Sequence, residues 1–529
     1  MARPYLGFRG HGLIRFMILT VVLPAYCLLG YNNAVFGGLL SLESFVEQFP
    51  TIDTVHTTGS KQAENARIQG TVVALYTVGC MFGALSCFSL GDKLGRLRTI
   101  AVGCILEIVG SILLSTSFSL GQLIVGRLVL GLGFGAITAT VPIWQSESSP
   151  AQHRGALVVL EGVFSSAGLA TSQWIDLGLF FAKSSVSWRF PLAFPIVFSF
   201  VILGFLPFLP DSPRWLVKHG RIAEAKSVMA ILEDTTEDSP VVENDIAKMQ
   251  HSLEEMGQGS FRGLFSNKKD RLLNRTLLAC FSTFSQQING IGIIGFYTNT
   301  IFEEFVGVSQ IVARVLSGSI YIFQLLCCFV AFGTIDRIGR RKLMMFGVTG
   351  MGICSAIVAG TVSQAAENKA CSIIAAICVF LFALFFGIGA LGINYLYGTE
   401  VAPLAYRVPI YALTTTTLWS FNFLVVEVTP VAFASIGYKY FIVFACINLF
   451  LLLPIIYFFL PETQRHSLED MDTIFRMSKN AFDVVKVSRE MVKGRLRADA
   501  AHAAVTVEVV DGPQGSDDEK PKVQSLENV

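Results

Sequence analysis

The sequence Asp92-Lys-Leu-Gly-Arg96 occurs a second time as Asp336-Arg-Ile-Gly-Arg340, and this repetition decides the fold of the chain. Two further motifs recur in the same order, each about 250 residues after its first copy. The paired copies are Glu147-Ser-Ser-Pro150 with Glu400-Val-Ala-Pro403, and Pro210-Asp211 with Pro461-Glu462. Three paired motifs at nearly one offset predict two homologous halves in parallel, a layout that places a site between the halves near the middle of a membrane.

Apolar runs separate these motifs, and they identify the chain as a multi-pass membrane protein. Of the 529 residues, 52% are hydrophobic and only 15% are charged. Twelve runs are long enough to cross the hydrocarbon, which takes roughly 20 residues each. They are 14–41, 68–90, 99–118, 121–146, 155–182, 187–209, 273–303, 311–334, 342–364, 371–400, 405–432 and 438–460. We therefore expect an all-α membrane protein with twelve transmembrane helices in two six-helix repeats.

The charged residues predict the orientation of these helices. Basic clusters follow the second, fourth, sixth and eighth spans, whereas the loop from Ser41 to Ala66 is mainly acidic. The positive-inside rule makes the basic side cytoplasmic, so both termini are expected in the cytoplasm. The net charge of +1 gives no reason to expect nucleic acid as a partner.

A polar insert separates six spans from six. Within it, Ile222–Glu233 and Val242–Met256 have helical periodicity, so short amphipathic helices are expected on the cytoplasmic face. The final residues after Pro461 have the composition of a disordered tail. The predicted organisation is a cytoplasmic N-terminus (1–13), a first bundle (14–209), a linker (210–272), a second bundle (273–460) and a cytoplasmic tail (461–529).

The stretch from Gln286 to Tyr297 is the candidate binding segment. Gln286, Gln287 and Asn289 bring several hydrogen-bonding groups into an apolar run, where an unpaired polar group costs a few kcal/mol. The amides either bind neighbouring helices, as polar residues in membranes often do, or bind a hydroxyl-rich solute. Three nearby glycines allow the helix to bend and a ligand to approach the backbone.

Catalytic chemistry has almost no support in the sequence. The eleven cysteines lie mainly within apolar runs, without a spacing that suggests a metal site. No Ser/His/Asp arrangement or phosphate-binding loop occurs either. We therefore expect neither an enzyme nor a metal or cofactor.

The repeated motifs resemble the signatures of the sugar porter family of the major facilitator superfamily. Pro210-Asp-Ser-Pro-Arg-Trp-Leu216 and Pro461-Glu-Thr463 strengthen the resemblance, which covers roughly residues 14–475. The stretch from Tyr395 to Pro403 looks most like fungal members. The resemblance implies a carrier that transports a hexose or related monosaccharide across the plasma membrane by alternating access, and we expect it to be monomeric.

The resemblance also implies which residues face the sugar. Gln286 and Gln287 match the family's paired glutamines, while Trp419 and Asn422 match an aromatic residue and an amide of the eleventh span. Aromatic rings stack on the C–H face of a pyranose, and amides bind its hydroxyls. The predicted substrate-binding residues are Gln286, Gln287, Gly292, Gln324, Asn394, Tyr395, Trp419 and Asn422.

The sequence departs from the family pattern at four places. Gly292 stands where the family has an Asn, and Tyr395 where it usually has a Trp. Glu161-Gly162 occurs where many members place a Gln, and the run ending in Asn394 lacks two prolines. Glucose, galactose, xylose, inositol and a uronic acid all stay open as substrates.

The first span bears on the energy source. Similar proton-coupled porters carry an Asp at the position of Asn32, facing the fourth-span arginine that matches Arg127. Because Asn cannot titrate, we predict facilitative uniport. Alternatively, Glu161 or Glu427 carries a proton, or either one pairs with Arg127, since charges inside a membrane are functional suspects. Glu107 is a third carboxylate within an apolar run.

The repeated acidic and basic residues suggest a cytoplasmic ion-pair network. We expect these pairs to tie the two halves together when the outer side is open and to separate when the inner side opens. The members are Asp92, Arg96, Glu147, Arg154, Asp211, Arg214, Asp336, Arg340, Glu400, Arg407 and Glu462. A sugar sensor that signals without transport is the alternative from another functional class.

Overall fold

The structure is a computed structural model that describes residues 5–149, 154–182, 184–256, 271–365, 368–403, 406–464 and 468–491. These residues form helices joined by short connections, without a β-strand in the described ranges. Long apolar runs fold this way because hydrocarbon offers no partner to the backbone, so each segment satisfies its own hydrogen bonds as a helix.

Six spans form the first half. The first consists of α1 (Gly10–Met17), a π-helical turn (Ile18–Val22) and α2 (Leu23–Leu39), and the sixth of α8 (Val186–Ala193) and α9 (Pro195–Phe205). A short helix, α3 (Glu43–Gln48), precedes the second span. The second to fifth spans are α4 (Gly59–Leu94), α5 (Arg96–Ser115), α6 (Leu120–Glu147) and α7 (Arg154–Phe180).

The second half contains two interrupted spans. The seventh is divided into α13 (Leu272–Ile288), α14 (Ile291–Thr300) and a π-helical turn (Ile301–Val306), and the tenth into α17 (Lys369–Gly389) and α18 (Ile393–Val401). The others are α15 (Gln310–Ile338), α16 (Arg340–Val362), α19 (Arg407–Ile436) and the pair α20 (Lys439–Cys446) and α21 (Leu453–Phe459).

Within the described residues, eleven helical segments have the length and hydropathy to cross a membrane. The span missing from these eleven is the fifth in chain order, α7. It has 27 residues and packs between α2 and α15. The prediction of a twelve-helix fold is confirmed. The helix ends differ from the predicted ones by a few residues, except that α4 begins nine residues earlier than expected.

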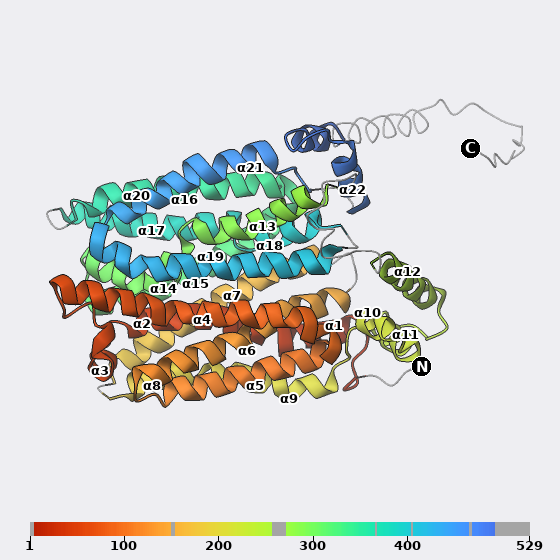
Figure 1. Cartoon of the computed structure of the whole chain (residues 1–529), viewed down its shortest axis with the longest axis horizontal. Coiled ribbons are helices and arrows are strands. Elements are labelled where there is room, and N and C mark those ends of the chain that lie inside the picture. The colour runs from red at the N-terminus through yellow and green to blue at the C-terminus, as the bar shows by residue number, and fades with distance from the viewer. Residues whose placement is uncertain are drawn as a thin grey trace, which may run out of the picture.

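The remaining helices define the two ends of the bundle. The linker forms α10 (Pro213–Lys218), α11 (Ile222–Leu232) and α12 (Pro240–Met256), and the tail begins with α22 (Leu468–Met477). All four lie at one end of the bundle, called here the linker side, whereas α3 lies at the other end, the α3 side (Figure 1). The last 38 residues (492–529), which include the predicted disordered end, lie outside the described residues.

Contacts between helices within a half rely on glycine where backbones approach closely. A Cβ on Gly79 of α4 would lie 2.5 Å from the carbonyl oxygen of Leu128 and 2.9 Å from the Cα of Gly131, both on α6. Such small residues let two membrane helices touch through their backbones. They fix the crossing of α4 and α6, and α4 in turn packs along α19 of the other half.

The ion pairs of the predicted network that the structure describes on the linker side, Arg96–Glu147 and Arg340–Glu400, lie within the halves, and for these residues this corrects the prediction that they join the two halves. Arg96 of α5 binds Glu147 of α6 through Nε and Nη2 at 3.1 and 3.2 Å. Arg340 of α16 binds Glu400 of α18 at 3.1 Å. Each half therefore carries its own pair, because helices of one half stay adjacent whichever side of the protein is open.

The repeated motifs have a further structural role at the start of α5 and of α16. Asp211 accepts a hydrogen bond from the backbone N–H of Arg96, and Glu462 accepts one from that of Arg340, at 3.2 and 2.9 Å. Arg214 lies close enough to Glu147 for the two charges to attract each other. The side chains of Asp92, Arg154, Asp336 and Arg407 lie outside what the structure describes.

We predict that Gly79→Val destabilises the protein by about 1–3 kcal/mol, because the added atoms meet backbone that cannot move aside. Thermal unfolding in detergent measures the effect as a lower midpoint temperature. Gly178→Val on α7 is the control, since a Cβ there meets nothing within 4 Å. Equal midpoints for the two variants would contradict the close packing of α4 on α6.

Candidate functional site

A cavity lies between the two halves, at the level where the seventh and tenth spans are interrupted. Its walls come from α2 and α7 of the first half and from α13, α14, α15, α17, α18 and α19 of the second. The space between the walls, including the part that opens to solvent, is about 780 Å³. This position between the halves, beside two interrupted helices, is where carriers built from repeated bundles place a binding site.

The break in the seventh span brings the amides to this cavity. Gly290 has a φ of +103°, which glycine adopts without strain, and the helix restarts at Ile291. Asn289 Oδ1 accepts a hydrogen bond from the Ile291 N–H at 2.9 Å, and Asn448 Nδ2 donates to the Asn289 carbonyl at 2.8 Å. The glycine-rich stretch thus bends the helix, as expected from the sequence.

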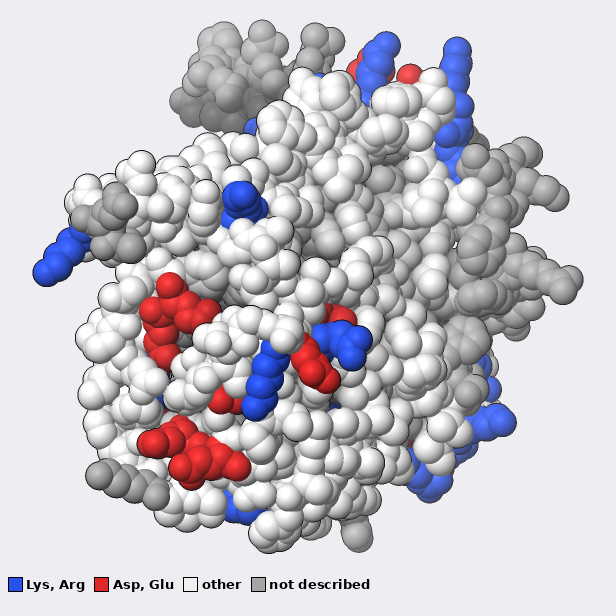
Figure 2. All heavy atoms as spheres, turned by 60° about the vertical axis from the view of Figure 1, so that its left-hand side comes forward, with Lys and Arg blue, Asp and Glu red and all other residues white. Residues whose placement is uncertain are grey.

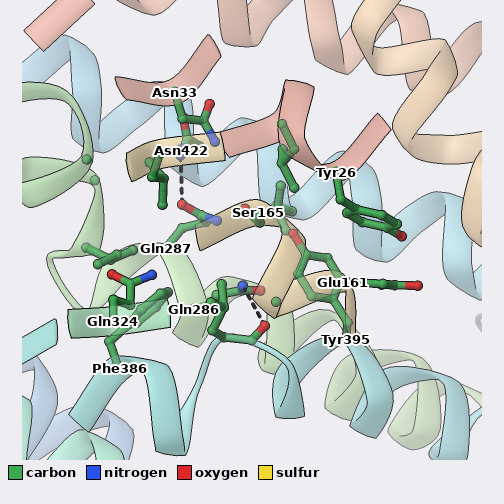
Figure 3. Close-up of a pocket in the computed structure, with 18 of the residues that line it drawn as sticks. Tyr26, Asn33, Glu161, Ser165, Gln286, Gln287, Gln324, Phe386, Tyr395 and Asn422 are labelled. Atoms are coloured by element: carbon green, nitrogen blue, oxygen red, sulfur yellow. Dashed lines mark hydrogen bonds between the residues drawn. The ribbon is translucent and has the colours of Figure 1, made fainter. Parts of the chain in front are cut away.

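Side-chain amides from three helices form one side of the cavity (Figure 3). Asn422 Nδ2 donates to Gln287 Oε1 at 2.7 Å, and Gln286 Nε2 donates to the Leu391 carbonyl at 3.3 Å. Gln324 Nε2 donates to Ser166 Oγ at 3.3 Å. These bonds use one end of each amide and hold its orientation.

The other ends of the amides have no hydrogen-bond partner among the described residues. Buried acceptors of this kind are Gln286 Oε1, Gln324 Oε1 and Asn422 Oδ1, and Trp419 Nε1 is a buried donor in the same condition. Leaving a buried polar atom without a partner costs about 1–3 kcal/mol. The cavity therefore presents acceptors and a donor that a hydroxyl-bearing ligand satisfies.

Aromatic side chains complete the walls. Trp419 and Tyr395 lie on the cavity from α19 and α18, and Phe296 and Phe386 add further apolar area. Tyr76 and Phe134 pack edge-to-face on the Trp419 indole, each with a centroid separation of 6.1 Å. Because these neighbours fix the indole, its face is a preorganised surface for the C–H groups of a ring.

Most of the predicted substrate-binding residues lie on the cavity, and one does not. Gln286, Gln287, Gly292, Gln324, Tyr395, Trp419 and Asn422 contribute to its walls, as does Glu161. Asn394 is buried outside the walls, where its carbonyl accepts a hydrogen bond from Ser282 Oγ at 2.9 Å. Its neighbour Tyr395 on α18 lies on the cavity, and a role of Asn394 in binding stays a prediction.

The sequence analysis missed four polar residues of the walls: Tyr26, Asn33, Ser165 and Tyr321. Tyr26, Leu29 and Asn33 are spaced as one face of a helix, and Ser165 follows Glu161 by one turn on α7. This periodicity was available in the sequence. It selects Asn33 rather than Asn32 as the amide that faces the cavity.

Asn32 and Arg127 belong to a separate buried cluster in the first half. Asn32 lies next to Glu107, which accepts hydrogen bonds from Ser111 and Ser199. Arg127 donates to the carbonyls of Val72 and Val73, and its guanidinium lies 4.1 Å from the centroid of the Phe36 ring. The expected approach of Asn32 to Arg127 is therefore replaced by carbonyl and aromatic contacts.

The two remaining candidate carboxylates also lie away from Arg127. Glu427 of α19 accepts a hydrogen bond from Thr71 of α4 at 2.7 Å, so it joins the two halves. Glu161 lies within hydrogen-bonding reach of the Tyr26 hydroxyl. The suggestion that either carboxylate pairs with Arg127 is wrong in this structure.

Comparison with known proteins assigns the chain to a family. The model of the family of sugar (and other) transporters matches residues 17–475. The chain belongs to this family. Among its relatives, the MFS-type transporter oryC of Aspergillus oryzae is 37% identical over 90% of this chain and 87% of its own length. The sugar transporter STL1 of Saccharomyces cerevisiae is 33% identical over 87% and 81%.

The fold of this sugar transporter family member agrees with solved structures of the major facilitator superfamily. A partially occluded inward-open structure of the xylose transporter XylE from E. coli has a TM-score of 0.71 and 19% identity. It covers 86% of this chain and 99% of its own. At this identity the likeness concerns the fold alone. The relatives of this chain are transporters, so its membership of the family confirms the expectation that it is not an enzyme.

In this transporter, polar contacts close the cavity toward the α3 side. Arg314 of α15 donates to the Gly38 carbonyl at 2.7 Å and to Ser41 Oγ at 2.9 Å, both at the end of α2. Asn299 of α14 donates to the Gly37 carbonyl at 3.0 Å and to Gln173 of α7 at 3.2 Å. Each contact joins one half to the other, so together they hold the α3 side shut.

Asp176 adds a buried charge to this closure. It lies on α7 close enough to Arg314 to interact with its charge, yet both of its carboxylate oxygens have no hydrogen-bond partner among the described residues. The guanidinium instead binds the end of α2. The sequence analysis missed this carboxylate, because a single Asp near the end of an apolar run resembles an ordinary interfacial residue.

We predict that Arg314→Gln shifts the population toward conformations open on the α3 side by about tenfold or more. The change removes two hydrogen bonds from a charged donor, each worth about 1.5–3 kcal/mol. Spin labels at Lys61 and Gln310 in a cysteine-free background report the separation of the halves as a distance distribution.

Arg189→Gln is the matched control, because Arg189 binds the carbonyls of Ser115 and Ser117 within one half. Its distance distribution should equal that of the parent protein. An unchanged distribution in Arg314→Gln would show that Arg314 does not hold the α3 side closed.

Proposed function

We propose that this family member transports a hexose or related monosaccharide across the plasma membrane by alternating access, as a facilitative uniporter. The observation that carries the proposal is the set of unpartnered amide atoms beside an aromatic wall, in a cavity between two halves. A sugar brings many hydroxyls that both donate and accept, and a ring with C–H faces. It satisfies both kinds of wall at once.

The contacts between the halves support alternating access. The described contacts of α2 with α14, and those of Arg314 and Asn299, all lie toward the α3 side. Breaking them while α4 and α19 stay packed together would expose the same cavity to the α3 side. A fixed site with two alternative closures is what carriers built from repeated bundles require.

The charge distribution supports the proposed orientation, with the linker side and both termini in the cytoplasm. Acidic side chains form patches on the end of the molecule seen in Figure 2, which brings the α3 side forward. On the linker side, α4 ends in Lys93 and α5 begins with Arg96 and Arg98. This asymmetry follows the positive-inside rule.

The buried cluster of the first half supports uniport. Asn32 cannot exchange a proton, and Arg127 already has two carbonyls and an aromatic ring as partners. Proton symport is the second candidate, and one observation favours it: the carboxyl of Glu161 lies on the cavity itself. Glu427 is a less direct candidate, because Thr71 holds it outside the walls.

We predict that replacing Gln287 with Leu lowers sugar flux in proteoliposomes about tenfold or more, because Asn422 then loses its partner and the sugar loses a binding group. Gln310→Leu, an exposed residue at the start of α15, is the matched control. Counterflow of labelled glucose, with competition by unlabelled sugars and polyols, measures both variants. If the parent protein showed no flux, the sensor alternative would be favoured. Full flux in Gln287→Leu would show that this amide does not bind the sugar.

A second experiment tests the transport mode. With an inward proton gradient across the liposomes, the internal concentration of sugar should reach the external one and rise no further. Accumulation above that level would contradict uniport. If Glu161→Gln then abolished accumulation while equilibrium exchange continued, Glu161 would be identified as the proton carrier.

A further inference from the structure

Glu161 is the one charged side chain among the described walls of the cavity. It lies on the second turn of α7, near the linker-side end, and only 8% of its surface is exposed. Charged groups are rarely buried in a membrane unless a function retains them. A carboxyl at this place acts directly on any ligand that enters.

Three tyrosines from three helices surround this carboxyl. Tyr26 of α2 reaches it with its hydroxyl, and Tyr395 of α18 and Tyr411 of α19 lie close enough to interact with its charge. Figure 3 shows Tyr26, Glu161 and Tyr395 together, on the side of the cavity away from Gln287 and Asn422. A carboxylate among aromatic rings is an arrangement that attracts a positively charged group.

No basic side chain from the described walls balances this charge. Arg127, the nearest candidate from the sequence, is separated from the cavity by Tyr76, which covers its guanidinium at 4.8 Å and also packs against Trp419. The guanidinium is occupied by two carbonyls of α4. A ligand carboxylate in the cavity would thus be buried without a counter-charge and beside another carboxyl.

The glycine after Glu161 leaves room for a ligand substituent at this end. A Cβ at Gly162 would meet Leu391 only at 3.4 Å, an ordinary contact, so a longer side chain there would project into the cavity. With glycine present, the space next to the carboxyl stays open. A substituent on the sugar ring can therefore reach Glu161.

We propose that Glu161 determines specificity by charge: the cavity accepts neutral sugars, binds protonated amino sugars at least as well, and excludes sugar acids. The inference rests on the proposed function and names the substrate class of the same cavity. An ammonium group gains a carboxyl that ionises beside it, a hydroxyl gains a hydrogen-bond partner, and a ligand carboxylate is buried without a basic group to pair with it.

Three ligands with the same ring test this proposal: glucose, glucosamine and glucuronate. Purified protein in liposomes is assayed by counterflow of labelled glucose at pH 6.5, which does not require a proton cycle, with each unlabelled ligand as competitor. Thermal stabilisation by the same ligands gives a second measure that is independent of flux. In the parent protein, glucuronate should compete at least about tenfold more weakly than glucose does. Glucosamine should compete at least as strongly as glucose.

Glu161→Gln keeps the size of the side chain and removes its charge. Glucosamine should lose affinity relative to glucose by about tenfold, because the ammonium loses its counter-ion, while glucose and glucuronate each change by less than about threefold. Glu161→Asp, which retains the charge, should preserve the parent order of the three ligands. Glu304→Gln, an exposed carboxylate outside the cavity, is the control and should leave all ratios unchanged.

If glucose flux is observed but the competition ratios are the same with and without Glu161, this inference is overturned while the proposed function stands. Equal competition by glucuronate and glucose in the parent protein would overturn it as well. Absence of both flux and stabilisation by all three ligands would overturn the proposed function for these sugars together with the inference.

Discussion

The hydrogen bond from Asn448 to the carbonyl of Asn289 sustains the feature on which the site depends. Within the hydrocarbon, a backbone group that leaves the helical pattern costs several kcal/mol unless another group reaches it. Here α13 ends, Gly290 adopts a left-handed conformation, and the amides of Asn289 and Asn448 satisfy the exposed backbone at 2.9 and 2.8 Å. The seventh span can therefore be interrupted inside the membrane.

This interruption and the one in the tenth span explain how oriented polar groups come to lie on the cavity. The Leu391 carbonyl, freed between α17 and α18, accepts the hydrogen bond of Gln286 and so orients that amide. Gln287 is oriented in the same way by Asn422. Structural hydrogen bonds thus use one end of each amide and leave the other end directed to a ligand, which is a preorganised arrangement that continuous helices would not offer.

The sequence predicted the twelve helices and the paired amides, because hydropathy and repetition act over many residues and do not depend on packing. Which side chain of a neighbouring pair faces the cavity was not predicted, although the spacing of Tyr26, Leu29 and Asn33 held that information for the first span. Asn33 and Tyr395 lie on it, whereas Asn32 and Asn394 point elsewhere, and the difference is about 100° of helix rotation set by contacts with other helices. The ion pairs were misassigned for a related reason, since motif spacing says which charges are near one another in sequence, not which helices they join.

The positions of the buried carboxyl groups show which of them change their surroundings when the two halves move and which do not. Glu107 is bound by Ser111 and Ser199 within one half, so its surroundings stay the same when the halves move as bodies. Glu161 and Glu427 lie where the halves meet, one on the cavity and one bonded to Thr71 across the interface. A proton site must change its environment during the cycle, and only these interfacial carboxylates and Asp176 meet that condition among the four discussed here. Asn32 cannot titrate and the guanidinium of Arg127 is held by two carbonyls, so neither residue meets this condition.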